Sequence, residues 1–263
     1  MTTSIDSTIK LRSKLLRISS RDRLRVSNST SDFSVNFFAV GDELQNSRGI
    51  TLMSASIPNV YYNVNKRNQT FSYLLNTGAG LVPSQVILPE GNYNVTEVIT
   101  ALATLIEVQT GGTFDISIVP FSGKLRFTLT GNLNTFSLQG PDSNNMATLL
   151  GITELDETES QNVFVSDLPN LKGLSDVFIS SDSLSNLTSM IAVNQEISAI
   201  NNIPIQVPWG ITEVYQIENI YTDTIPYERA KNIETIDIKL FDQDFILLDL
   251  QGQPVEFVFK IWY

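Results

Sequence analysis

The chain has 263 residues, a formal net charge of −11, and neither histidine nor cysteine. This length is enough for one large all-β domain with additions, or for two small domains, and its core is well above the marginal size limit. We expect one domain. Without His and Cys, Ser-His-Asp and Cys-His nucleophile systems cannot form, and the usual zinc sites lose their main ligands. No disulfide is possible either, which is compatible with a reducing cytoplasm. We therefore expect no enzyme activity, metal, cofactor or small-molecule substrate.

Charge is unevenly distributed along the chain. Residues 1–25 carry a net charge of +5, so the other residues together carry −16. An acidic body disfavours wrapping of nucleic acid, and contact with nucleic acid is expected only through the basic segment. We expect residues 1–25 to form a basic N-terminal arm, with a disordered tail as the alternative. Its candidate contact residues are Lys10, Arg12, Lys14, Arg17, Arg21, Arg23 and Arg25.

Nothing in the sequence indicates export or membrane insertion. The first thirty residues lack a long apolar run after a basic start. No stretch approaches the roughly 18 to 20 apolar residues that a membrane span needs. We expect neither a signal peptide nor a transmembrane segment.

The N-terminal third is predicted to form strands. Residues 31–38 alternate apolar Phe33, Val35 and Phe37 with polar residues, the period-two pattern of a half-buried strand. Residues 50–57 repeat this pattern before Pro58, and residues 70–75 form the next predicted strand.

The middle of the chain adds helices. Asn94 is predicted to cap a helix from Val95 to about residue 108, which Gly111-Gly112 ends. Its apolar positions Val98, Leu102, Leu105 and Ile106 share one helical face. The other predicted elements are strands at 85–88 and 135–138, a hairpin of 114–119 and 124–130 turning near Ser122-Gly123, a helix from 143 to 150 before Gly151, and a loop at 153–160.

The C-terminal third returns to strands rich in β-branched and aromatic residues. They are predicted at 176–180, 203–207, 213–217, 234–240 and 255–262. About ten short strands joined by turns indicate an all-β sandwich, barrel or jelly roll. We predict one domain over residues 26–263, with a small insertion containing two short helices at about 85–152.

Two groups of side chains invite a functional interpretation. Asp242, Asp244 and Asp249 lie close to Glu256 in sequence and suit acid-base catalysis or calcium, although acidic residues around a strand more often mark its solvent face. The tyrosines suit sugar stacking in a jelly-roll lectin, so a carbohydrate-binding or host-attachment role is the alternative function. They are Tyr61, Tyr62, Tyr73 and Tyr93.

Several short segments together carry a family resemblance. They are ISSRDR (18–23), LMSASIPNVYYN (52–63), LPEGNYNV (88–95), LLGI (149–152), VFISSDSL (177–184), the segment 207–215 with its Pro208-Trp209-Gly210 turn, and the ending 233–263. In order and spacing they resemble the penton, or vertex, proteins of virophages, polinton-like viruses and related large DNA viruses.

This resemblance implies a structural role in a virion. Such a protein is a jelly roll that forms homopentamers at the five-fold vertices of an icosahedral double-stranded DNA virus shell. Its partners are copies of itself, capsomers of a double jelly-roll major capsid protein, and minor or cement capsid proteins. Assembly is expected in the cytoplasm of the infected cell. The basic arm would then extend beneath neighbouring capsomers or toward the virion interior.

Overall fold

The computed structural model describes residues 12–24, 29–36, 44–76, 79–130, 135–140, 145–153, 163–185, 190–192, 195–218 and 224–263. These residues divide into two compact units, each with its own hydrophobic core. The first unit comprises the described residues within Met1–Tyr61 and Leu174–Tyr263, and the second those within Tyr62–Gly173. In the chain, the second unit is therefore an insertion in the first.

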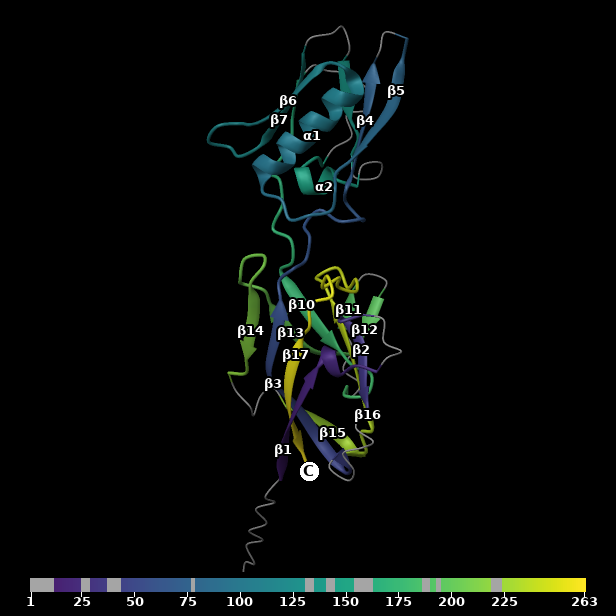
Figure 1. The fold of residues 1–263 in the computed structure, drawn as a ribbon, viewed down its shortest axis with the longest axis vertical. Coiled ribbons are helices and arrows are strands. Elements are labelled where there is room, and N and C mark those ends of the chain that lie inside the picture. The colour runs from purple at the N-terminus through teal and green to yellow at the C-terminus, as the bar shows by residue number, and fades with distance from the viewer. Residues whose placement is uncertain are drawn as a thin grey trace, which may run out of the picture. The chain divides into compact units, whose positions relative to one another are not determined.

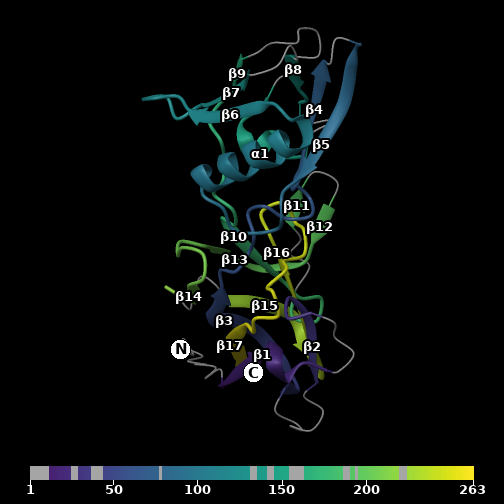
Figure 2. The ribbon, with the colours of Figure 1, turned by 45° about the horizontal axis from the view of Figure 1, so that its top comes forward.

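The first unit contains two antiparallel sheets (Figures 1 and 2). One has the order β1 (Ser13–Ser19), β17 (Glu256–Trp262), β3 (Ser47–Pro58), with β14 (Thr212–Gln216) and β15 (Thr224–Lys231) both paired to β3. β14 pairs with residues 54–58 and β15 with the segment that starts at residue 47, so the two occupy one interrupted edge. The other has the order β13 (Ala199–Pro204), β10 (Asp176–Ser180), β16 (Thr235–Phe241), β2 (Asp32–Asn36).

The strand order identifies the fold. With β14 and β15 counted as one strand, the first sheet holds the first, eighth, third and sixth strands in chain order. The second holds the fifth, fourth, seventh and second. Two interleaved Greek keys of this kind form a jelly roll. The predicted all-β jelly roll is confirmed, and a separate hairpin of β11 (Met190–Ala192) and β12 (Gln195–Ile197) is added to it.

The core of the first unit comes from period-two alternation on its strands. Phe257, Phe259 and Ile261 of β17 are fully buried, and every second residue between them is partly exposed. β16 contributes its own buried alternate residues in the same way. Burying a side chain of this size stabilises the fold by about 1.5–3 kcal/mol. This layer between the sheets holds the unit together.

The N-terminal segment differs from the predicted arm. Residues 13–19 form β1, which pairs with β17 over its whole length. Ile18 is buried in the core and Leu16 packs against it, while Arg17 between them is exposed. Because buried and exposed residues alternate, this segment forms a sheet strand. Its charge alone had predicted an arm. A short 3-10 helix, η1 (Ser20–Asp22), follows.

The second unit has two small sheets and two helices. The first sheet has the order β5 (Leu81–Ile87), β4 (Thr70–Asn76), β8 (Thr135–Leu138), and the second β6 (Thr113–Ile118), β7 (Leu125–Thr130), β9 (Val163–Val165). The helices are α1 (Val95–Thr110) and α2 (Ala147–Leu150). Aromatic rings link the two sheets: Phe71 of β4 stacks on Phe127 of β7 with ring centroids 6.2 Å apart.

Helix α1 follows from its sequence. The Asn94 side chain accepts a hydrogen bond from the Glu97 amide at 3.0 Å, and the Glu97 side chain accepts one from the Asn94 amide at 2.9 Å. This reciprocal capping box begins the predicted helix at Val95, as expected. On its apolar face Leu105 is only half-buried, and Ile99 is buried instead.

Several predicted boundaries were wrong. The inserted unit spans 62–173 rather than 85–152, because β4 and the partly buried Phe164 of β9 belong to its core. The strand predicted at 203–207 is instead β13, which ends at Pro204. β9 and β15 were not predicted. The second helix ends at Gly151 as predicted but begins at Ala147, and most of the predicted loop 153–160 lies outside the described residues.

Gly111 and Gly151 end the two helices and provide a matched pair of substitutions. Both are left-handed, with φ of 65° and 73°. A Cβ at position 111 would meet nothing within 4 Å, whereas one at position 151 would lie 2.6 Å from the carbonyl oxygen of Asp167. We expect Gly111→Ala to lower the free energy of unfolding by about 1–2 kcal/mol, the cost of the left-handed conformation. Gly151→Ala should lower the free energy of unfolding clearly more, because the backbone at Asp167 must also move to make room for the new Cβ. Equal losses in urea denaturation would contradict this steric account.

Asp237 on β16 anchors the turn that follows β10. Its carboxylate accepts hydrogen bonds from the amides of Asp182 and Ser183, both at 2.9 Å. Burial raises the pKa of Asp237, but hydrogen bonds from Ser183 and from the backbone outweigh it, so the pKa lies below its ordinary value. The charged form is therefore the one that the fold stabilises.

This depressed pKa predicts acid sensitivity of the first unit. The stability contributed by Asp237 is complete above its unfolded-state pKa of about 3.9 and is lost as the pH falls through the lower folded value. We expect Asp237→Asn to be less stable than wild type near pH 6 and the gap to narrow below about pH 4. The test is to measure the urea midpoints of wild type and Asp237→Asn between about pH 6 and pH 4 and below, with Asp182→Asn as the control. A gap that stays constant at every pH would refute the assignment.

Candidate assembly surface

The two outer edges of the first sheet are candidate contact surfaces. β1 forms one edge, and β14 with β15 forms the opposite one. Within the described part of the chain, no strand pairs with the outer side of either. Such edges present unpaired N–H and C=O groups that proteins cover or protect.

The β1 edge is strongly basic. Residues 12–24, called the basic edge below, carry five basic residues and one acid, Asp22, a net charge of +4. The basic residues are all exposed and are five of the seven predicted contact residues: Arg12, Lys14, Arg17, Arg21 and Arg23. Lys10 and Arg25 lie outside the described residues. Leu15 is also exposed here, with 69% of its surface accessible.

One of these cations is held by its own sheet. The Arg17 guanidinium donates a hydrogen bond to Glu256 of β17 at 2.6 Å. This bond and the carboxylate charge raise the pKa of Arg17. Because the Arg17 side chain is exposed and that of Glu256 is partly exposed, the pair adds little to stability. The other four basic side chains leave the edge with a net positive surface.

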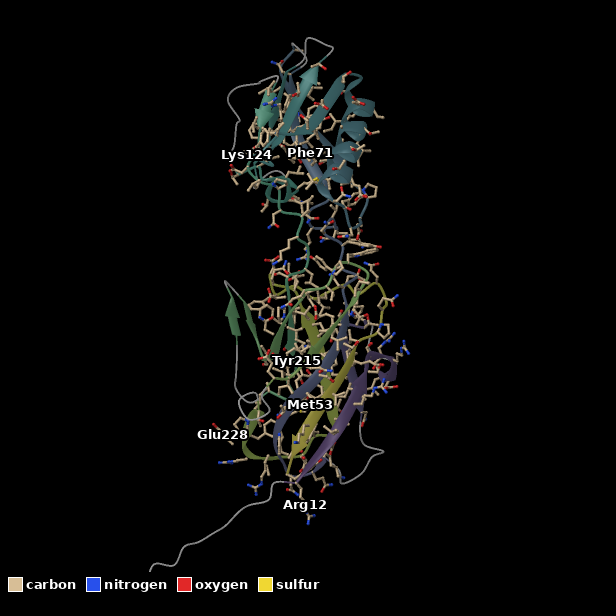
Figure 3. The ribbon with its side chains drawn as sticks, turned by 90° about the vertical axis from the view of Figure 1, so that its left-hand side faces the viewer. Arg12, Met53, Phe71, Lys124, Tyr215 and Glu228 are labelled. Carbon is tan, nitrogen blue, oxygen red and sulfur yellow. The ribbon has the colours of Figure 1, made fainter. Side chains whose placement is uncertain are left out.

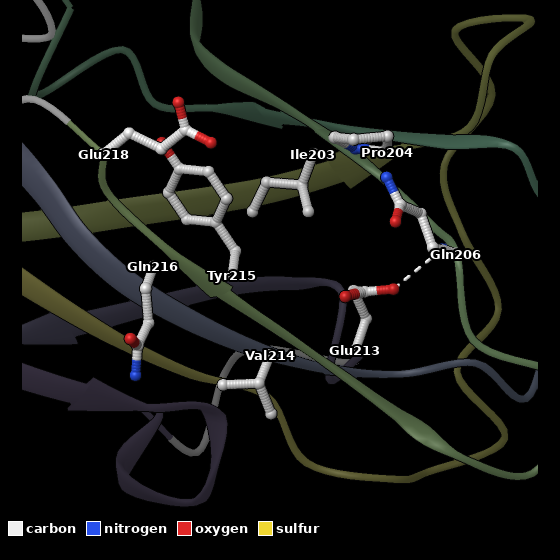
Figure 4. Close-up of a pocket in the computed structure, with 8 residues that line it drawn as sticks. All are labelled: Ile203, Pro204, Gln206, Glu213, Val214, Tyr215, Gln216 and Glu218. Carbon is white, nitrogen blue, oxygen red and sulfur yellow. Dashed lines mark hydrogen bonds between the residues drawn. The ribbon is translucent and has the colours of Figure 1, made fainter.

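The β14 edge carries an open pocket of about 360 Å³ (Figure 4). It lies between β13 and β14, where the margins of the two sheets meet. In Figure 4 Tyr215 lies between Glu213 and Glu218, the charged residues of the lining. The lining residues are Ile203, Pro204, Gln206, Glu213, Val214, Tyr215, Gln216 and Glu218. Figure 3 labels Tyr215 here and Arg12 at the start of β1.

The loop between β13 and β14 is fixed from two sides. The Asn59 side chain donates a hydrogen bond to the Val207 carbonyl at 2.9 Å, and the Asn59 carbonyl accepts one from the Gly210 amide at 2.7 Å. The Glu213 carboxylate accepts from the Gln206 amide at 2.7 Å. These bonds hold the Pro208-Trp209-Gly210 turn at the end of β3 and set the wall of the pocket.

The same edge is apolar and acidic. Trp209, Ile211 and Val214 expose 46%, 52% and 59% of their surfaces beside the pocket. Residues 203–218, called the acidic edge below, contain Glu213 and Glu218 but no Lys or Arg, a net charge of −2. Sequence reasoning missed this surface. The sequence feature that could have indicated it is the absence of Lys and Arg from residues 203–218, around the Pro208-Trp209-Gly210 turn.

The carboxylates that suggested catalysis or calcium organise turns instead. Asp242 is fully buried, not solvent-facing as predicted, and its Oδ1 accepts hydrogen bonds from the amides of Asp244 and Ile246, each at 2.9 Å. Asp249 accepts one from the Gln251 amide at 2.9 Å. Glu256 bonds Arg17. Their hydrogen bonds therefore go to separate turns and strands.

Tyr73 and Tyr93, two of the four tyrosines, make hydrogen bonds within the second unit. Tyr73 is buried and its hydroxyl donates to Gln109 at 2.9 Å. The Tyr93 hydroxyl donates to the Pro89 carbonyl at 2.8 Å. Tyr61 packs against the core of the first unit, whereas Tyr62 belongs to the second. Tyr73 is therefore a core residue and offers no ring face to a sugar.

Two other kinds of feature are absent from the described residues. These residues hold no group of three or more His, Cys, Asp or Glu placed to bind a metal ion. A helix with the length and apolar character for crossing a membrane is likewise absent from this part of the chain.

Comparison with known proteins shows a similarity to solved structures along almost the whole chain. No protein-family model matches the sequence, and a search of curated proteins found no significant match. Among solved structures, the chain is similar to a crystal structure of the selenomethionine-labelled penton protein of mavirus. The TM-score is 0.52 at 11% sequence identity, over 95% of this chain and 99% of that one. This similarity establishes a shared fold.

Asn59 tests how the acidic edge is built. Asn59→Ala removes the donor to Val207 and leaves that carbonyl unsatisfied, so we expect a loss of about 1–3 kcal/mol in the free energy of unfolding. Acrylamide quenching of Trp209, in a Trp262→Phe background, should rise as the turn loosens. The matched control is Asn202→Ala, since Asn202 is exposed and its loss should stay within about 0.5 kcal/mol. If Asn59→Ala and Asn202→Ala lose the same stability and show the same quenching of Trp209, Asn59 does not fix the turn.

Proposed function

We propose that this protein is a capsid protein that forms homopentamers at the five-fold vertices of an icosahedral double-stranded DNA virus shell. The observation that carries the proposal is the similarity to the mavirus penton protein across 95% of the chain. Because the match covers 95% of the chain, it includes residues of both compact units and not the jelly roll alone.

The first unit suits a ring of identical copies. Rotation about a five-fold axis places unlike surfaces in contact, so each copy needs two different sides. The two outer edges of the first sheet supply such sides, one basic and the other apolar and acidic. A two-fold dimer would instead need one self-complementary patch.

Further partners follow from the proposed position in the shell. A vertex capsomer docks against the surrounding capsomers of a major capsid protein, with minor or cement proteins as additional neighbours. Because of their positive charge, residues 1–25 would contact acidic capsid surfaces or the genome. The protein would therefore reside in the virion and assemble in the infected cell. No substrate or cofactor is part of this role.

A carbohydrate-binding or host-attachment role is the second candidate. Phe121, at the turn between β6 and β7, is fully exposed, with a left-handed φ of 64°. An exposed aromatic ring at a loop tip is a surface on which a sugar can stack. A glycan array comparing wild type with Phe121→Ala tests this role, and an absence of hits would exclude it.

The solution mass of the purified protein tests the vertex role. We expect light scattering to give five times the chain mass of 29.2 kDa at moderate ionic strength, and negative-stain images to show five-fold rings. The physical reason is that complementary unlike edges close a ring rather than a dimer. A closed ring of another symmetry, or a monomer at every concentration, would contradict a self-assembling pentamer. The monomer result would favour the attachment role.

A further inference from the structure

We infer that the basic edge of one copy docks on the acidic edge of the next copy. The contact surface comprises β1 and η1 on one side, and β14 with the Pro208-Trp209-Gly210 turn and the pocket on the other. This inference rests on the proposed ring and specifies which surfaces form it.

Sheet geometry places these edges where a head-to-tail contact needs them. β1 and β14 are the opposite margins of one sheet, separated by β17 and β3. Three strand spacings put them roughly 14 Å or more apart in a single chain. The two margins of a sheet face away from each other, so one copy cannot satisfy both edges itself. Copies related by rotation can join them in sequence around an axis.

The charges of the two edges are complementary. The basic edge carries +4 and the acidic edge −2, within a chain whose total charge is −11. The body is therefore acidic, and the basic edge is its exception. Attraction between unlike edges and repulsion between like ones select head-to-tail docking over pairing of identical edges. The attraction weakens as salt increases.

The pocket can receive a cationic side chain. Glu213 and Glu218 supply carboxylates at its wall, and the Tyr215 ring offers a π face that favours a cation. Exposed Leu15 on the basic edge has apolar counterparts in Trp209 and Val214. The contact between the two edges would thus combine apolar side chains with opposite charges, as specific protein interfaces do.

Chemical cross-linking between the edges provides the test. The chain has no cysteine, so Leu15→Cys and Val214→Cys introduce the only thiols. Both side chains are exposed, and a bismaleimide shorter than roughly 14 Å cannot join them within one chain. We expect the double variant to give a ladder of covalent products that ends at five chains. Each single variant should remain uncross-linked.

The possible results separate the inference from the proposed function. A ladder that ends at five supports both. A ladder that ends at another size, or does not end, supports the edge contact and overturns the pentamer. Five-fold rings without any cross-linked product overturn the edge contact and leave the vertex role standing. Monomers without cross-links overturn both.

Charge reversal gives an independent readout. R12E/K14E/R21E changes the basic edge from +4 to −2, and Q216K/E218K changes the acidic edge from −2 to +1. We expect each to raise the concentration needed for half-assembly by about tenfold or more at low salt. Combining them restores opposite charges at every contact and should recover assembly. The control is K66E/R126E/K172E on the second unit, which makes the same change of −6 in charge as the triple variant of the basic edge. It should leave the concentration needed for half-assembly unchanged. Loss of assembly in this control, or no rescue in the combined variant, would overturn the inference.

Discussion

The position of β17 between β1 and β3 is the constraint on which the first unit depends. This last strand pairs on both sides and contributes Phe257, Phe259 and Ile261 to the core. At its end the Trp262 indole donates to the Thr51 hydroxyl of β3 at 2.9 Å. The sheet therefore joins both ends of the described chain. Without β17, β1 would have no partner, and the basic edge would be the arm that its charge suggested.

Hydrogen bonds of buried and half-buried polar residues connect several of the segments that carried the family resemblance. Ser20 of ISSRDR is fully buried, and its hydroxyl accepts a hydrogen bond from the Val255 amide at 3.0 Å. Asn63 accepts from the Tyr93 amide at 2.9 Å, which joins two more of the segments within the second unit. Asp237 joins the ending to the turn after β10. Buried polar groups must be hydrogen-bonded, so such positions tolerate few residue types. These segments are signatures of architecture rather than chemistry.

What the sequence predicted depended on how local each signal was. α1 was predicted because Asn94, Glu97 and the apolar face all lie in one stretch of chain. β16 and β17 were predicted because their alternation is clean. β1 was missed because charge obscured the alternation of Leu16 and Ile18 around Arg17. The burial of Asp242 could not be predicted, since it depends on a tight turn between β16 and β17.

The acidic edge was harder still to predict. Its pocket needs β13 and β14, which belong to different sheets, and a turn fixed by Asn59 from far away in sequence. Neither the pocket nor the exposure of Val214 follows from composition. Only the charge of the segment could be seen in advance. The basic edge, in contrast, was recognised by its charge but not by its structure.

A ring built from these edges does not require a strong single contact. Exposed charges are screened by salt, and a few half-exposed apolar side chains contribute modestly. Closing a ring, however, makes the last contact intramolecular, so a complete ring gains one contact without the entropy loss of adding another chain. Rings are then favoured over partial arcs even when each edge binds weakly. Weak, reversible contacts would also let a misplaced copy dissociate before closure, which would favour a correctly closed ring.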